Sequence, residues 1–179
     1  MPSPIGHALG GALVGGLVVA RRAPAVVRRP LDRWIGSAAR GWRLAVVLGL
    51  AATLPDLDLL VGLHSRYTHS VGAALAVGTA AWLASRRDWR FAAAVTLAYA
   101  SHVLFDTLSN DTSPPIGIMA LWPFSSRFYQ SAWHVFVPIS RRYWLPGFLA
   151  HNLRAVVWEV LLLGPLTLWV WWGGRKTTR

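Results

Sequence analysis

The residues in this sequence whose types could do chemistry are a few histidines and aspartates near the ends of apolar runs. His102 and Asp106 are four residues apart, so a helix places both side chains on one face, where they can close on one ion. Neutral imidazoles combined with carboxylates suit zinc, manganese or iron. For this pair alone, a hydrogen bond in which the carboxylate only orients the imidazole is an equally good interpretation.

Two further carboxylates lie in the motif Leu54-Pro55-Asp56-Leu57-Asp58. Proline lacks a backbone N–H and disfavours continuation of the preceding helix, so we expect Asp56 and Asp58 on an opened turn. Such a turn can direct both carboxylates into one cavity. One of the two could instead cap a helix, because a carboxylate stabilises a helix N-terminus.

The segment from His64 to Ser70 places two imidazoles and a guanidinium at the boundary between two apolar runs. Thr68 or Ser70 is suited to cap the helix that follows. Arg66 carries a fixed fork of donors that suits a phosphate or carboxylate of a substrate, or it pairs with lipid headgroups. His64 and His69 need a further explanation, and metal binding provides one.

Composition indicates an integral membrane protein. Of 179 residues, 54% are hydrophobic, and 18 basic residues outnumber 7 acidic ones. This apolar content exceeds what one water-soluble core of this size needs. The net charge of +11 does not indicate nucleic acid, because the arginines form short clusters between apolar runs, as in membrane loops. The absence of cysteine excludes disulfides and thiolate zinc sites.

We expect an all-α fold, a polytopic transmembrane helical bundle of four to five spans with an extracytoplasmic loop segment. It forms a single integral membrane domain over residues 1–179. Several of its apolar runs are shorter than the roughly 20 residues that cross a bilayer. Glycines in the first run repeat at a spacing that lets helix backbones approach closely, so we expect this helix inside the bundle. The expected spans lie near residues 5–20, 44–63, 71–84, 91–108 and 155–172, with an outer segment at 109–146.

The basic segments predict the orientation of these spans. Short arginine-rich loops stay in the cytoplasm, and arginines crowd the segment between the first and second runs. Ionisable groups at a membrane edge are costly and usually functional, and pairing or metal binding offsets the cost. Alternating the spans from the first basic loop places seven such groups near the extracytoplasmic face: His7, Asp56, Asp58, His64, His69, His102 and Asp106.

Five motifs in a fixed order carry a family resemblance: His7 in a glycine-rich helix, Leu54-Pro55-Asp56-Leu57-Asp58, the His64 to Ser70 run, Ser101-His102-Val103-Leu104-Phe105-Asp106, and Leu121-Trp122-Pro123-Phe124-Ser125. With these motifs the chain resembles the membrane-bound, metal-dependent hydrolases of the YdjM type, described as LexA-regulated. The motifs span residues 7 to 125, and the combination is much more specific than any one part. The resemblance implies a helical membrane hydrolase. The chain is also faintly similar to zinc-dependent phospholipases C, and this similarity implies that phosphoesters are the first candidates for its substrate.

We therefore expect a metal-dependent hydrolase at the extracytoplasmic face of a bacterial or archaeal cell membrane, acting on a lipid or lipid-linked phosphoester. A divalent ion, zinc or manganese, would activate a bound water and polarise the phosphoryl oxygen. Asp58 or His64 would act as general base or orient the ligands, and Arg66 would contact the substrate. Membrane lipids are the expected partners. The expected metal ligands are His7, Asp56, His69, His102 and Asp106.

Three other functions fit parts of the sequence. A proton- or metal-coupled transporter would use ionisable residues along a path across the bilayer, and Glu159 stands deep in the last apolar run. Glu159 could pair with Arg154 or His151, or reach the cluster as another ligand. A serine hydrolase using Ser101 or Ser70 lacks the G-x-S-x-G elbow. A non-enzymatic structural membrane protein has a similar composition.

Overall fold

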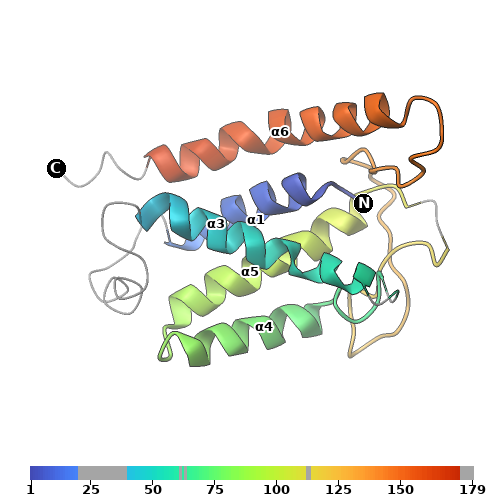
Figure 1. Ribbon diagram of the computed structural model, residues 1–179. Helices are drawn as coiled ribbons and strands as arrows, with labels where there is room; N and C mark the ends of the chain where they lie inside the picture. Colours follow the sequence, from blue (N-terminus) through green and yellow to red (C-terminus); the bar gives the residue numbers. More distant parts are fainter. Residues whose placement is uncertain (20–39, 61, 63, 112–113, 174–179) are drawn as a thin grey trace.

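The computed structural model describes residues 1–19, 40–60, 62, 64–111 and 114–173, and the regular structure of these residues is helical (Figure 1). The all-α prediction is confirmed for this part of the chain. The helices are α1 (Pro4–Val19), α3 (Arg40–Thr53), α4 (Val71–Ala84), α5 (Trp89–Thr107) and α6 (Phe148–Gly173), with a short 3-10 helix η2 (Leu54–Leu60) after α3.

Local sequence signals explain the ends of α3 and α4. The α-helix α3 stops just before Pro55, and the chain continues as η2, as the missing backbone N–H of proline predicts. The Ser70 side chain accepts a hydrogen bond of 3.1 Å from the backbone N–H of Ala73, so it caps α4. Of the two predicted caps, Ser70 therefore fills the role, and α4 has the bounds expected of the third span.

The ends of α5 and α6 differ by a few residues from the predicted spans. α5 begins at Trp89 because the Asp88 carboxylate accepts a hydrogen bond of 3.1 Å from the backbone N–H of Phe91. α6 begins at Phe148, well before the predicted residue 155. The chain turns at Gly147, whose φ of +81° suits glycine, and the helix starts directly after this turn.

The length of the helices bears on how many of them cross a membrane. Among the described residues, Phe148–Trp172 is the one helix long and apolar enough to do so by itself, and Pro4–Val19 and Val71–Ala84 are shorter apolar helices. The count of four to five spans stays a prediction. The basic residues at positions 21–33 and 175–179, on which the predicted orientation partly depends, lie outside the described residues.

α1 lies in the middle of the bundle, in contact with α3, α5 and α6, whereas α4 packs on α5 (Figure 1). Glycines permit this arrangement. A Cβ atom at Gly11 would lie 2.3 Å from the Cβ of Ala52 and 2.7 Å from the carbonyl oxygen of Leu48. One at Gly15 would lie 2.8 Å from the carbonyl oxygen of Ala94. The prediction that the first helix packs inside the bundle is confirmed.

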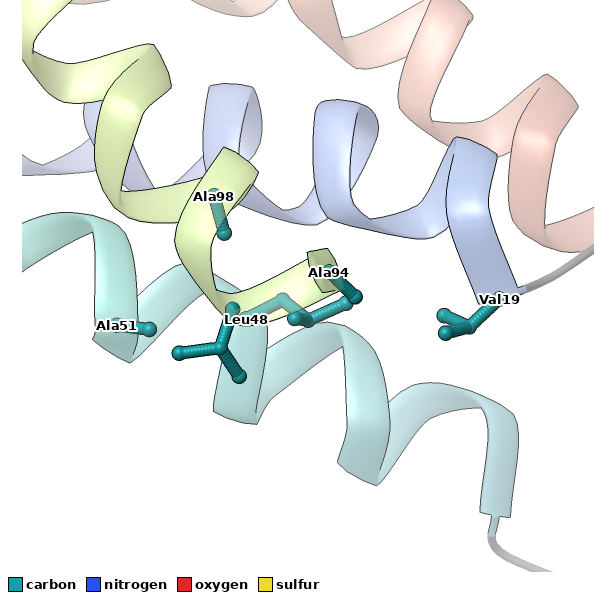
Figure 2. Close-up of a cluster of buried hydrophobic side chains, with 6 residues drawn as sticks. Val19, Leu48, Ala51, Ala94 and Ala98 are labelled. Atoms are coloured by element: carbon teal, nitrogen blue, oxygen red, sulfur yellow. The ribbon is translucent and has the colours of Figure 1, made fainter. Parts of the chain in front are cut away.

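A cluster of buried apolar side chains joins three helices near the C-terminal end of α1 (Figure 2). Leu48 of α3 is fully buried, and the small side chains of Ala94 and Ala98 of α5 let the two helices come close around it. Val19, near the end of α1, packs in the same cluster. His7 is twelve positions before Val19 in α1, or about 18 Å along a helix, so the polar site lies at the other end of α1 from Val19.

Glu159 connects α6 to the start of α1. Its carboxylate accepts a hydrogen bond of 2.7 Å from the backbone N–H of Ser3 and a second, short one from the Ser3 hydroxyl. Of the partners left open for Glu159, namely Arg154, His151 and the metal ligands, none is the one observed: its carboxylate binds Ser3. α6 packs along α1, so position 159 faces the α1 N-terminus, where the helix dipole favours a carboxylate.

The elements that carry the candidate site meet at one end of the bundle. Figure 1 shows the start of α1, the end of α5, η2 and the start of α6 at this end, together with the segment that connects α5 to α6. The titratable side chains predicted to share one membrane face lie on these elements or in the turn before α4.

Candidate metal centre

Four ligand atoms from separate parts of the chain come together at this end. Asp56 Oδ1 lies 3.7 Å from His69 Nε2 and 3.7 Å from His102 Nε2. Asp106 Oδ2 lies 3.4 Å from His69 Nε2 and 3.1 Å from His102 Nε2. Ligand atoms 2.0 to 2.1 Å from a tetrahedral zinc ion lie about 3.3 Å from one another, so these four distances are close to those around such an ion.

His7 extends this group from α1. Its Nε2 lies 3.3 Å from Asp106 Oδ1, the carboxylate oxygen that is not directed at His69 and His102. The imidazole also stacks on that of His102, with ring centroids 3.6 Å apart. His7, His102 and Asp106 are all buried, and their ligand atoms lie within 4.8 Å of one another. We call His7, Asp56, His69, His102 and Asp106 the His/Asp cluster.

The polar atoms at the centre of the cluster have no hydrogen-bond partner. This holds for His7 Nε2, His69 Nε2, His102 Nε2 and both carboxylate oxygens of Asp106, all of which are buried. Native proteins rarely leave buried polar groups unsatisfied, because each one costs about 1 to 3 kcal/mol. A metal ion held among these atoms would satisfy several of them, so the residues present fit a divalent metal ion.

Neighbouring groups orient two of the imidazoles. The Nδ1–H of His102 donates a hydrogen bond of 2.7 Å to the backbone carbonyl of Ala52, and Nδ1 of His69 lies 3.1 Å from Asp58 Oδ2. Thr68 donates from its hydroxyl to the same Asp58 oxygen at 2.5 Å. A proton on Nδ1 leaves the Nε2 lone pair available to an ion, which is the usual arrangement of a histidine ligand.

Asp58 thus contacts one of the expected ligands, His69, and is not itself a member of the His/Asp cluster. Its other oxygen, Oδ1, lies 2.7 Å from Nδ1 of His64, whose ring meets that of His69 edge-on at 4.6 Å. The ligand atoms of Asp56, His64 and His69 also lie within 4.8 Å of one another, so His64 stands at the border of the cluster. Asp56 is the exposed edge of the group, with 21% of its side chain accessible, against none for His69.

The two loop histidines differ in their affinity for protons. Burial lowers the pKa of His64, and the Arg141 charge adds to this effect, although the Asp58 hydrogen bond opposes it. Burial would also lower the pKa of His69, but hydrogen bonds with Asp56 and Asp58 outweigh it and raise this pKa to about 9. His69 therefore holds a proton at neutral pH without an ion, and an ion must displace it.

Arg66 is apart from the His/Asp cluster and lines an adjacent cavity with Arg141. The sequence interpretation did not single out Arg141 as a site residue, nor the Ala52 carbonyl and Thr68 that hold the ligands in place. Arg141 carried one signal: an arginine pair in a segment predicted to be extracytoplasmic is unusual, because arginines concentrate in cytoplasmic loops. A backbone carbonyl such as that of Ala52 carries no side-chain signal.

A helical bundle with a long apolar helix and a buried group of histidines and aspartates at one end fits the class of membrane proteins with a candidate metal site. The chain belongs to the YdjM inner membrane protein family, whose model matches residues 1–177. The family resemblance read from the five motifs is thereby confirmed. Neither the curated proteins nor the solved structures include a significant match to the chain.

Proposed function

We propose that the protein is a metal-dependent hydrolase that acts on a lipid or lipid-linked phosphoester at the extracytoplasmic face of the membrane. The observation that carries this proposal is the group of unpartnered ligand atoms of His69, His102 and Asp106, with Asp56 Oδ1 at the spacing of a tetrahedral site. Zinc or manganese suits this set of nitrogen and oxygen ligands.

The residues of the chain have separate roles in this proposal. A bound divalent ion would supply an activated water and polarise the phosphoryl oxygen. Asp56 is the ligand with exposed surface, with 21% of its side chain accessible. His64 accepts a proton at Nε2, and Asp58 stabilises the imidazolium through Nδ1, since the two atoms are 2.7 Å apart.

Metal analysis and a substrate screen test the activity. Purified protein is expected to contain zinc or manganese, to hydrolyse phosphatidic acid or a lipid pyrophosphate, and to lose turnover with a chelator. His64→Ala should lower turnover by about 100-fold or more while the bound ion remains, because general base catalysis contributes that much. Arg127→Ala, at an exposed position of the outer segment, is the control. A metal-loaded protein that cleaves none of these phosphoesters would refute the hydrolase and leave the metal centre standing.

The orientation of the site is tested by reporter fusions. A reporter after Arg87 is expected to be cytoplasmic, because Arg86 and Arg87 lie in the short turn between α4 and α5, and Arg90 lies in the first turn of α5. A reporter after the exposed Ser126 should be extracytoplasmic. The two signals are read as alkaline phosphatase and fluorescent-protein activities in cells. The opposite pattern would move the site to the cytoplasmic face, and the substrate would then have to be sought in that leaflet.

A further inference from the structure

A cavity of about 650 Å³ opens beside the His/Asp cluster, and its wall is rich in positive charge. Arg66, Arg141 and Arg142 line it, and we call it the arginine cavity. Asp111 is the acidic residue among its described lining residues, and its carboxylate accepts a hydrogen bond of 3.2 Å from the backbone N–H of Gly117. An excess of cationic side chains in a cavity concentrates anions there.

His64 forms the wall between the arginine cavity and the His/Asp cluster. On the cavity side, Nη2 of Arg141 lies 2.9 Å from His64 Nε2. On the other side, His64 Nδ1 contacts Asp58, which in turn contacts His69. An anion held by the arginines would therefore lie next to the proposed reacting centre.

A second cavity, of about 560 Å³, continues from the first along α6. The two share Asn110 and Pro138 in their linings. Most of the remaining lining is apolar, and includes Val157, Trp158 and Leu161 of α6. We call it the apolar groove. A cationic cavity that continues into an apolar groove on the helix that qualifies as a membrane span has the chemistry of a binding site for an amphiphile.

Exposed aromatic side chains lie at the edge of the arginine cavity. Tyr143 and Trp144 are 76% and 66% exposed, and they come directly before Leu145, a lining residue, and the start of α6. Tyrosine and tryptophan concentrate at the boundary between lipid and water, because they combine an apolar ring with a polar group. Their exposure beside the cavity favours a mouth at the level of lipid headgroups.

We propose that the arginine cavity binds the phosphate group of an amphiphilic phosphoester through Arg66 and Arg141, while the apolar groove holds its acyl chain. This inference rests on the proposed hydrolase and names how that enzyme would recognise its substrate. The guanidinium fork matches phosphate oxygens. Once Arg141 donates to phosphate, it no longer occupies His64 Nε2, which also lies 2.7 Å from the Met1 Sδ.

Binding can be measured without turnover, on full-length protein in a non-ionic detergent with a chelator present. The probe is a short-chain phosphatidic acid with a fluorophore on one acyl chain, followed by fluorescence polarisation. Arg66→Gln and Arg141→Gln should each raise the Kd about tenfold, since each removes charge-assisted hydrogen bonds to phosphate. Arg127→Gln, a change of the same type at an exposed arginine of the same outer segment, should change the Kd less than twofold.

Competition identifies the source of the phosphate. Unlabelled dihexanoyl phosphatidic acid should displace the probe at a concentration at least tenfold lower than inorganic phosphate does. If inorganic phosphate competes equally well, the cavity serves a soluble phosphate and the amphiphile is wrong. If Arg66→Gln and Arg141→Gln bind the probe as tightly as Arg127→Gln, the cavity is not the phosphate site.

These binding measurements can fail or succeed independently of the proposed hydrolase activity. His102→Ala, which removes a metal ligand, should still bind the probe, because the measurement is made without metal. Retained metal in His102→Ala, together with retained probe binding, would count against the metal centre alone. Metal-dependent turnover that persists in Arg66→Gln and Arg141→Gln, with unchanged lipid affinity, would count against the arginine cavity alone.

Discussion

Replacing His102 or Asp106 by alanine is expected to abolish metal-dependent turnover and to lower metal affinity by at least about 100-fold, more than loss of an orienting contact does. The reason is geometric. Asp106 directs one oxygen at His7 and the other at His69 and His102, so its removal affects every imidazole in the His/Asp cluster. His102 contributes Nε2 at 3.1 Å from Asp106. Metal content, measured by elemental analysis, and turnover per folded molecule are the two readouts.

The double variant separates a ligand from a structural hydrogen bond. If both residues hold one ion, the double variant should be little worse than either single variant, because groups that act through one ion fail together. Arg127→Ala, outside the cluster and outside the linings of both cavities, should retain both metal and turnover. If the pair only orients an imidazole, each single change should reduce folded yield, while the surviving protein keeps its metal content and specific activity. That result would refute the metal centre.

The second large effect is expected at Gly11, where α1 meets α3. A methyl group at this position would lie 2.3 Å from the Ala52 Cβ and 2.7 Å from the Leu48 carbonyl oxygen, so the two helices must separate. We expect Gly11→Ala to lower the free energy of unfolding by about 1 to 3 kcal/mol, the usual cost of overpacking. Metal affinity should also fall, because the Ala52 carbonyl accepts the hydrogen bond from His102.

Gly164→Ala in α6 is the matched control, since the nearest atom to an added Cβ is the Val160 Cγ1 at 3.7 Å, an ordinary contact. Alanine is better than glycine inside a helix by about 0.5 to 1 kcal/mol, so this variant should be as stable as the parent or slightly more so. Thermal unfolding in detergent, with and without zinc, measures both variants. Equal stability of Gly11→Ala and the parent would show that α1 and α3 are not closely packed.

Features that depend on neighbours in the sequence were predicted well. Ser70 caps α4 and Pro55 ends α3, because a cap or a missing N–H acts within one helical turn. The spacing of His102 and Asp106 places them one turn apart on α5. The glycines of the first run indicated a packed helix through their small size alone.

Features that depend on the packing of distant segments could not be predicted in the same way. Glu159 and Ser3 are 156 residues apart, and their contact exists because α6 lies along α1. Arg141 and His64 are separated by 77 residues and meet only when the outer segment folds over η2 and the following turn. The order of the helices around α1 decides such pairs, and the apolar faces in the sequence are compatible with several orders.

The distribution of the His/Asp cluster along the chain has a consequence for biogenesis. Its members lie in α1, in η2, in the turn that precedes α4, and in α5, and they extend from residue 7 to residue 106. A chain synthesised from its N-terminus therefore exposes His7 long before Asp106 exists. In the proposed metal centre, tight capture of the ion has to wait until α5 has been inserted beside α1. Metal loading would then occur only after these early and late segments of the nascent chain have packed together.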